Sequence, residues 1–403
     1  MFLGITVCCF ICMVAAAKPE FILPKIIYAA PGIESNIYFS NVFTSVAPHN
    51  FAYVVKCPQG RQENKRWCWT PNVKDAGKVI PMTLEAYDDN GLAASASCRI
   101  QVAAPVQNPD RKFTLALLAA SSANNGYPQH ILDVMKQHGF KNYTPVGSHC
   151  GFGAPLAPGK AAHDGYGGWG WDSFLHQWSY SEAEYNNIQD QAEREQMKSF
   201  GITTRPGIQY RLRSPLLNRK GGKVYRDVPG WFKKINAGNP PDFIVIDLGA
   251  NNVFLCTESN LKETLQNKVL PAMTELVNEI RKAAPLTVIG ITTRNLGCSQ
   301  DGFGANYGCK QSRYQWLRNI RAYNQLVLDF IAHRQDPDII EVPLYQNIDS
   351  ENSYPIKNVP CHARTARKVL RQSNALHSTR SGGMQFGDAI YCWLRVQMNR
   401  KNY

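Results

Sequence analysis

Residues 113–138 read FTLALLAASSANNGYPQHILDVMKQH and change character twice along their length. An apolar run from Phe113 to Leu118 is followed by a loop of small polar residues. Residues 127–138 then place apolar side chains three and four positions apart, which is typical of a helix. A strand that is apolar on both faces, followed by a helix, is the repeating unit of α/β proteins with a mostly parallel sheet.

The same pattern recurs towards the C-terminus, so we expect one α/β sheet covered by helices on both faces. The sequence predicts further strands at 243–248, 286–291 and 339–342, and helices at 261–284, 314–331 and 383–398. The Gly- and Trp-rich, then polar, stretch 148–234 has no clear periodicity. We assign no regular structure to it.

The residues in front of this sheet have a different pattern. From about 26 to 102 the chain consists of short β-rich runs separated by turn signals, and Asn90-Gly91 between two such runs indicates a hairpin. We predict a small antiparallel β-sandwich. The segment Ala104 to Pro109 is typical of a linker, which gives a β-sandwich domain at 18–107 and an α/β domain at 108–403.

Residues 1–17 form an uncharged apolar run that ends in three alanines before a polar Lys-Pro-Glu. This is typical of a secretory signal peptide, although the missing Lys or Arg near its start leaves an uncleaved anchor as the alternative. No later run approaches 18 apolar residues. We therefore expect a secreted, extracellular protein without stable membrane insertion, and Asn142-Tyr143-Thr144 is a candidate N-glycosylation site.

Twelve cysteines are present, and nine remain if residues 1–17 are removed. None of these nine forms a Cys-x-x-Cys pair, so an exported chain favours disulfides over zinc. Nine is an odd number, so at least one thiol stays free or pairs with another chain. The pair we favour is Cys298 with Cys309, because these two cysteines flank a Gly-rich loop.

The net charge of +13 favours anionic surroundings, such as acidic glycan, nucleic acid or a membrane surface. The chain has no zinc spacing and no aromatic-basic motif that would support nucleic acid binding. It also lacks the glycine-rich and Walker patterns of nucleotide sites, so we expect no cofactor and no metal.

In a parallel α/β sheet, ligands bind at the carboxyl ends of the strands. Ser121 follows the first predicted strand, Gly249-Ala-Asn251 follows the second, and His377 lies just before the last helix. Each has an ordinary structural explanation alone, as a helix cap, a turn former or a buried side chain. Together, a hydroxyl, amide donors and an imidazole are the parts that acyl transfer requires.

Four segments in this order resemble the SGNH (GDSL-like) hydrolases, over about residues 110–395. Leu117 to Pro128 resembles the first block of that family, and residues 163–171 (HDGYGGWGW) resemble the second. Residues 249–252 (GANN) resemble the third block, and residues 374–377 (NALH) resemble the fifth. The resemblance implies a flavodoxin-like parallel sheet preceded by the β-sandwich.

The resemblance also implies roles for individual residues. Ser121 would be the nucleophile and His377 the general base, with Asn374 orienting His377. Asn251 would be an oxyanion donor together with Gly168, with the neighbouring Gly167 as the alternative assignment.

Three carboxylates of the family pattern are missing from these segments. Gly-Asp-Ser has become Ala119-Ala120-Ser121, Gly-x-Asn-Asp ends in Asn252, and the acid of Asp-x-x-His has become Asn374. In the Ser-His-Asp proteases, the change from Asp to Asn beside the base costs about 10⁴ in turnover. A catalytically silent binding or matrix protein that keeps the SGNH fold is therefore the alternative to an enzyme.

The preferred interpretation is a secreted serine ester hydrolase. The family resemblance and the expected export favour a carbohydrate O-acetylesterase, with a carbohydrate ester or an acidic glycan as the partner. Trp169 and Trp171 lie beside the second block and are candidates for a substrate-binding wall.

Overall fold

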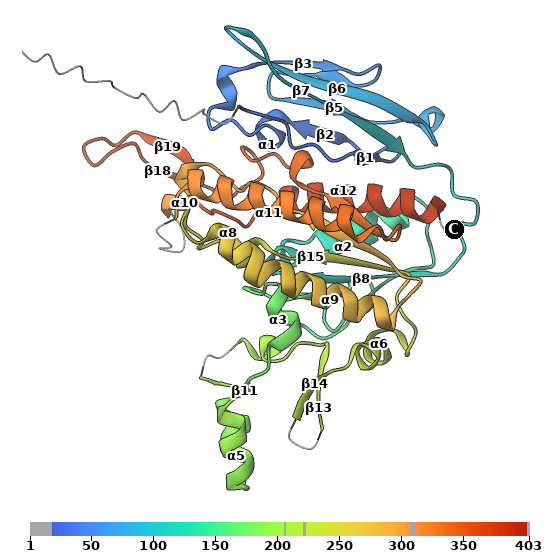
Figure 1. Ribbon diagram of the computed structural model, residues 1–403, viewed down its shortest axis with the longest axis vertical. Helices are drawn as coiled ribbons and strands as arrows, with labels where there is room; N and C mark the ends of the chain where they lie inside the picture. The colour runs from blue at the N-terminus through green and yellow to red at the C-terminus, as the bar shows by residue number, and fades with distance from the viewer. Residues whose placement is uncertain (1–17, 205–206, 221–222, 306–310, 401–403) are drawn as a thin grey trace, which may run out of the picture.

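The computed structural model describes residues 18–204, 207–220, 223–305 and 311–400. Figure 1 shows a β-rich layer at the N-terminus, a central sheet between helices, and a projecting arm that carries α5 (Gln191–Lys198). The segment 1–17 and Cys309 lie outside the described residues, and so do the predictions made for them.

The central sheet is entirely parallel and has the flavodoxin-like order. Both β9 and β10 pair with the same edge of β8, β9 along its first half and β10 at its end. Beyond β8 follow β15, β16 and β17, which gives the spatial order 2-1-3-4-5 and confirms the predicted fold class. The strands are β8 (Phe113–Ala119), β9 (Tyr143–Val146), β10 (Asp164–Gly165), β15 (Phe243–Asp247), β16 (Val288–Thr293) and β17 (Ile339–Pro343).

Each strand of this sheet is apolar on both faces because helices cover both faces. Alternate residues of β8 enter different cores, with Leu118 in one and Leu117 in the other. The core of Leu117 lies under α2 (Tyr127–Gln137) and α12 (Arg380–Arg400). The core of Leu118 lies under α3 (Trp171–His176), α6 (Val228–Asn236), α7 (Ala250–Val253), α9 (Leu270–Ala283) and α11 (Arg313–Arg334).

The predicted helix at 261–284 is present but is not a uniform α-helix. It begins as α8 (Leu261–Thr264), continues as a π-helical turn η5 (Leu265–Val269), and ends as α9. Leu265 and Val269 of the π-helical turn and Met273 of α9 lie in one core, so the buried side is the one that the apolar spacing of the sequence predicts.

Two small sheets form the N-terminal β-sandwich. One has the order β1-β7-β6-β3, the other has the order β2-β5-β4, and Ile37, Trp67 and Leu84 lie in their shared core. The arrangement differs from the fully antiparallel prediction at the edge, because β1 pairs with β7 in parallel. The strands are β1 (Ile26–Ala29), β2 (Ser35–Tyr38), β3 (Ala52–Lys56), β4 (Arg61–Gln62), β5 (Arg66–Trp69), β6 (Val79–Asp88) and β7 (Gly91–Val102).

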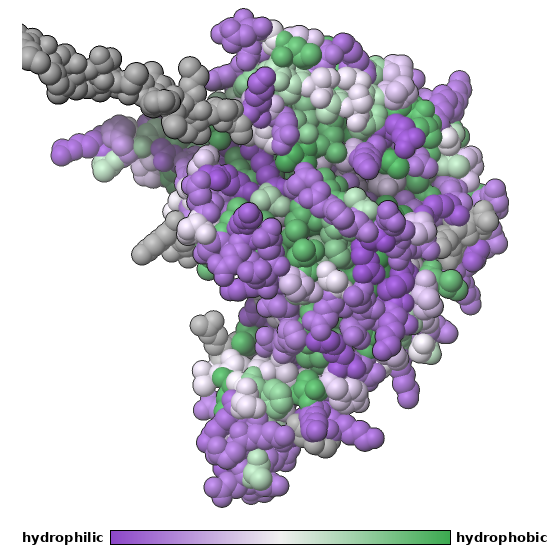
Figure 2. All heavy atoms as spheres, in the orientation of Figure 1, coloured by the Kyte–Doolittle hydropathy of each residue, from purple (hydrophilic) through white to green (hydrophobic). Residues whose placement is uncertain are grey.

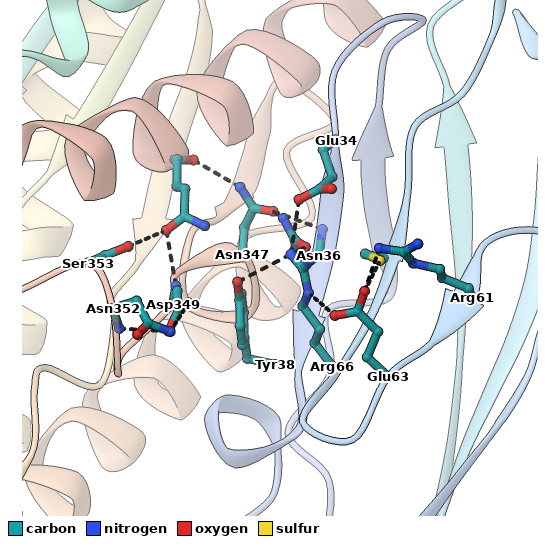
Figure 3. Close-up of polar contacts among 12 residues, drawn as sticks. Glu34, Asn36, Tyr38, Arg61, Glu63, Arg66, Asn347, Asp349, Asn352 and Ser353 are labelled. Carbon is teal, nitrogen blue, oxygen red and sulfur yellow. Dashed lines mark hydrogen bonds and ion pairs between the residues drawn. The ribbon is translucent and has the colours of Figure 1, made fainter.

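A buried polar contact joins the sandwich to the α/β part. Oδ1 of Asn347 accepts hydrogen bonds from the backbone N–H of Asn36 at 2.9 Å and from its side-chain amide at 3.2 Å. Figure 3 shows Asn347 lying between Asn36 and the ribbon of the α/β part. A cavity of about 520 Å³ lies nearby, between Tyr38 of β2 and the loop around Asp349, and it is lined by neither Ser121 nor His377.

Two hairpins and an arm lie outside the layers. The arm and its hairpin contain β11 (Tyr180–Ser181), α4 (Glu182–Asn186), α5, β12 (Ile202–Thr203), β13 (Leu217–Lys220) and β14 (Lys223–Arg226). The second hairpin contains β18 (Ile356–Pro360) and β19 (Lys368–Gln372). The short helices α1 (Phe39–Val42) and α10 (Gln300–Ala305) complete the fold.

The eight cysteines within the described residues are free thiols, so the expected disulfides are not found there. Cys298 is buried, and the partner predicted for it is outside the described part of the chain. Within that part, we find no helix with the length and apolar character needed to cross a membrane.

Candidate active site

The candidate site lies where the strand order of the sheet reverses. In a 2-1-3-4-5 sheet this point is between the carboxyl ends of β8 and β15. Ser121 opens a short 3-10 helix directly after β8, and Asn251 lies in α7 directly after β15. His377 arrives from the segment that precedes α12. Residues more than 250 positions apart in the sequence thus meet at one edge of the sheet.

A hydroxyl and an imidazole are in direct contact at this edge. The distance between Oγ of Ser121 and Nε2 of His377 is 2.8 Å, which is a hydrogen bond of the length that a nucleophile and its base require. Burial lowers the pKa of His377 below its usual value, and the positive charge of Arg294 lowers it further. The lowered pKa favours the neutral form of the imidazole, which can accept a proton.

Asn374 contacts His377 through the backbone. Its Oδ1 accepts hydrogen bonds from the N–H of His377 at 2.9 Å and from the N–H of Leu376 at 3.1 Å. This is an Asx-type turn, in which a side-chain oxygen fixes the two residues that follow it. We predicted that Asn374 orients the ring of His377, and the observed contact fixes the turn that carries the ring.

Two glycines lie beside the serine. A Cβ atom on Gly167 would be 3.9 Å from the Cβ of Ser121, so the backbone at Gly167 passes close to the nucleophile. Gly168 has φ of +84°, in the left-handed region that favours glycine. A side chain at Gly168 would strain the backbone, so glycine is required there, whereas the nearest atom to a Cβ added at Gly167 would be Nη1 of the flexible Arg211 side chain, at 3.2 Å.

Asn251 is held towards the same glycine-containing segment. Its side-chain amide donates a hydrogen bond of 2.7 Å to the carbonyl of Trp169, and the amide carries a second N–H. The neighbouring Asn252 accepts from the N–H of Trp171 at 3.1 Å and donates to Asp172 at 2.8 Å. These contacts join α7, which follows β15, to residues 169–172, directly after Gly168, so the Asn251 amide and the Gly168 segment are held near each other, as an oxyanion hole needs.

The prediction that Trp169 and Trp171 form a substrate wall is wrong. Trp171 is fully buried, and its indole N–H donates to Tyr323 at 3.1 Å. Trp169 is 5% exposed and stacks on Tyr166 with 4.2 Å between ring centroids. Tryptophan is amphipathic, so a tryptophan beside a glycine turn can either pack in the core or contact a ligand. Here both rings are packed in the core.

Arg211 is a site residue that the sequence did not indicate. It comes from the stretch that we left unassigned, and its Nη1 donates a hydrogen bond of 2.6 Å to the carbonyl of Gly167. Its guanidinium also lies over the ring of Tyr210, 5.8 Å from the centroid. Arg211 thereby supports the segment beside Ser121 and places a positive charge near it.

A buried charge pair supports the floor of the site. Asp247 at the end of β15 forms an ion pair with Arg294 and accepts hydrogen bonds from Ser122 at 2.7 Å and Tyr127 at 3.0 Å. Buried charges of this kind are stable only when they are paired and hydrogen-bonded. The signal in the sequence is an aspartate that ends an otherwise apolar strand, FIVID at 243–247.

A comparison with protein-family models finds no match, and neither does a comparison with curated protein sequences. Among solved structures, the chain is similar to a family 3 carbohydrate esterase of Clostridium thermocellum, with a TM-score of 0.37 and 13% identity over 70% of this chain and 94% of that one. A carbohydrate esterase family 3 protein from Talaromyces cellulolyticus has a TM-score of 0.40 and 12% identity over 72% and 99%.

A third similar structure is a family two carbohydrate esterase from Clostridium thermocellum in complex with cellohexaose. Its TM-score is 0.33 and its identity 11%, over 93% of this chain and 94% of that one. Scores this low assign neither substrate nor activity. The strand order and the position of the Ser121–His377 contact, taken from the chain itself, define a flavodoxin-like α/β fold with a candidate site at its switch point.

Proposed function

We propose that the chain is a serine ester hydrolase whose nucleophile is Ser121 and whose general base is His377. The observation that carries the proposal is the 2.8 Å hydrogen bond between Oγ and Nε2 at the switch point of the sheet. A serine that only capped a helix would not need an imidazole at its hydroxyl, whereas a serine that acts as the nucleophile in acyl transfer does.

In the proposed reaction, Oγ of Ser121 attacks the ester carbonyl carbon while its proton passes to Nε2 of His377. The tetrahedral oxyanion is stabilised by the N–H groups of Ser121 and Gly168 and by the second amide N–H of Asn251. The C–O bond to the leaving alcohol then breaks, and His377 returns the proton to that alcohol. A water molecule, deprotonated by His377, then attacks the acyl carbon, the bond from that carbon to Oγ breaks, the acid leaves, and His377 returns the proton to Oγ of Ser121.

For the substrate, we propose an O-acetyl group on a carbohydrate and an extracellular location. The apolar segment at 1–17 and the sequon at Asn142 are the grounds for export. The alternative is a silent binding protein, which the missing carboxylates favour. Turnover decides between these two functions.

The test compares hydrolysis of an aryl acetate and of acetylated glycans by the wild-type chain, Ser121→Ala and Ser122→Ala. Ser122 is the adjacent serine and donates to Asp247, so its replacement is a matched control for local disturbance. We expect Ser121→Ala to lose at least about a thousandfold in kcat. We expect Ser122→Ala to keep most of its activity. Wild-type hydrolysis no faster than that of Ser121→Ala would establish the silent protein.

A further inference from the structure

The β18–β19 hairpin, which shortly precedes His377 in the sequence, concentrates positive charge. Between residues 352 and 387 the sequence contains no Asp or Glu. Within this span, the hairpin carries five of the basic residues of the chain: Lys357, Arg364, Arg367, Lys368 and Arg371. Figure 1 shows the hairpin projecting from the body of the molecule, and Figure 2 shows the same projection largely in the colour of hydrophilic residues.

These charges are exposed and have no acidic partner among the described residues. All five side chains are exposed, and none of them takes part in an ion pair with the described Asp and Glu side chains. Lys357 lies directly opposite Arg371 in the antiparallel register. Like charges at opposed positions destabilise a hairpin, so this placement does not serve folding.

The β13–β14 hairpin provides an internal comparison. It also places two cations opposite each other, Lys220 and Lys223. There, however, the flanking arginines are neutralised, Arg219 by Glu193 at 3.2 Å and Arg226 by Glu275 at 2.6 Å. The β18–β19 hairpin therefore differs from the β13–β14 hairpin, because none of its arginines has an acidic partner among the described residues.

The cationic hairpin is continuous in sequence with the segment that carries the base, and its last residue is held by hydrogen bonds. Its last residue, Gln372, donates to the carbonyl of Glu351 at 2.7 Å and accepts from the N–H of Ser299 at 2.6 Å. The next residue, Ser373, donates its N–H to the carbonyl of Pro355 at 2.7 Å. His377 follows four residues later, so the hairpin and the base belong to one continuous stretch of chain.

We propose that the β18–β19 hairpin is the docking surface for an acidic polysaccharide that carries carboxylates. Three of its five cations are arginines, whose planar forks match carboxylate geometry. A chain of repeated anionic groups can contact several exposed cations at once, which a single small anion cannot. The docking is independent of turnover, and only the delivery of an ester to Ser121 rests on the proposed function.

Carboxylated glycan fits the hairpin better than single-stranded nucleic acid does. Residues 356–372 contain no Phe, Tyr or Trp. Proteins that bind single strands combine basic grooves with aromatic side chains on which bases stack. Without such rings, the surface offers charge and hydrogen-bond donors but no platform for bases.

The experiment measures binding of polygalacturonate by the full chain carrying Ser121→Ala, which prevents hydrolysis during the assay. Into this background we introduce Lys357→Gln with Arg371→Gln, or, as the matched control, Lys220→Gln with Lys223→Gln. Both pairs remove two opposed charges from an exposed hairpin. We expect the first pair to weaken binding about tenfold and to reduce its salt dependence, and the second to change affinity less than twofold.

A third variant, Arg364→Gln with Arg367→Gln in the connecting turn, repeats the test where strand pairing is not affected. Absence of binding, or equal losses in the β18–β19 and β13–β14 variants, would overturn the proposal. So would equal affinity for fully methyl-esterified polygalacturonate, which is neutral, or tighter binding of single-stranded DNA. Because binding is measured without turnover, failure of the docking proposal is distinguishable from failure of the proposed function. Failure of the proposed function would appear as aryl acetate hydrolysis by the wild-type chain that is no faster than by Ser121→Ala.

Discussion

At the scale of single residues, the site depends on one donor and one acceptor held in contact. The hydroxyl of Ser121 and the imidazole of His377 are joined by a hydrogen bond of 2.8 Å, and burial lowers the pKa of the imidazole. Asn374 supports the pair from the backbone side, through the N–H of His377. The acid that would normally contact the base is thus replaced by a residue that fixes the turn.

The role of Asn374 predicts unequal effects of two substitutions. Asp at this position keeps an oxygen that can accept both N–H groups, so we expect Asn374→Asp to retain turnover within about threefold. Asn374→Ala leaves the two N–H groups without this acceptor and should cost about 1 kcal/mol in the free energy of unfolding. It should also lower kcat about tenfold through misplacement of His377. Urea unfolding measures the first effect and aryl acetate kinetics the second. A large gain of kcat in Asn374→Asp would contradict this role and would indicate that residue 374 contacts the ring of His377.

The lowered pKa of His377 predicts the pH dependence of the reaction. Only the neutral imidazole accepts a proton, so kcat/KM rises with pH through the pKa of the free enzyme. Burial first, and the charge of Arg294 second, lower that pKa, so we expect the midpoint to lie below about 6.5. Two esters with different leaving groups should give the same midpoint. A midpoint above about 6.5 would contradict the observed environment of His377.

At the scale of elements, the site is assembled from strand ends and from one inserted segment. The carboxyl ends of β8 and β15 supply Ser121 and Asn251, while the insertion that contains the α5 arm also supplies Arg211. A parallel sheet brings its strand ends together regardless of their separation in sequence. The insertion adds a cation that the sheet alone does not provide.

Arg211 should therefore affect catalysis more than stability. Lysine cannot reproduce the directed hydrogen bond to the carbonyl of Gly167, so we expect Arg211→Lys to lower kcat about tenfold with little change in Tm. Arg213→Lys is the matched control. Arg213 lies on the same segment but pairs with Glu184 at 2.6 Å and lies over Trp178. Equal effects of the two substitutions would show that the segment, and not Arg211, matters.

Regular elements and strand ends were predictable, whereas contacts made by irregular segments were not. The apolar runs at 113–118 and 243–248 predict β8 and β15, and the residues after them predict Ser121 and Asn251. Arg211 lies in a stretch without periodicity, so nothing in the sequence relates it to Gly167. The tryptophans near Gly168 were misplaced because composition does not distinguish a buried ring from a binding ring.

At the scale of the whole molecule, the sandwich and the α/β part share their interior. Tyr345 of the α/β part lies in the core of the sandwich, and Tyr28 of the sandwich lies in a core of the α/β part. The buried Asn36–Asn347 contact adds a polar connection between them (Figure 3). We therefore expect the two parts to unfold together.

Asn347→Ala tests this coupling. It leaves the buried backbone N–H and amide of Asn36 without their acceptor, and should lower the free energy of unfolding by about 1–3 kcal/mol. Asn352→Ala, at an exposed position nearby, should change it by less than about 0.5 kcal/mol. Urea unfolding, followed by circular dichroism and by tryptophan fluorescence, measures the free energy of unfolding of both variants. Well-separated transitions in the wild-type chain would show that the two parts fold independently.

The most direct measurement is the location of covalent labelling by a fluorophosphonate, read by mass spectrometry of peptides from the intact chain. Ser121 and Ser122 are adjacent, but only Ser121 contacts His377, while Ser122 donates to Asp247. We predict an adduct on Ser121 that is lost in Ser121→Ala and strongly reduced in His377→Ala. An adduct on another residue, or no adduct on the folded wild-type chain, would contradict the assignment of a serine hydrolase site.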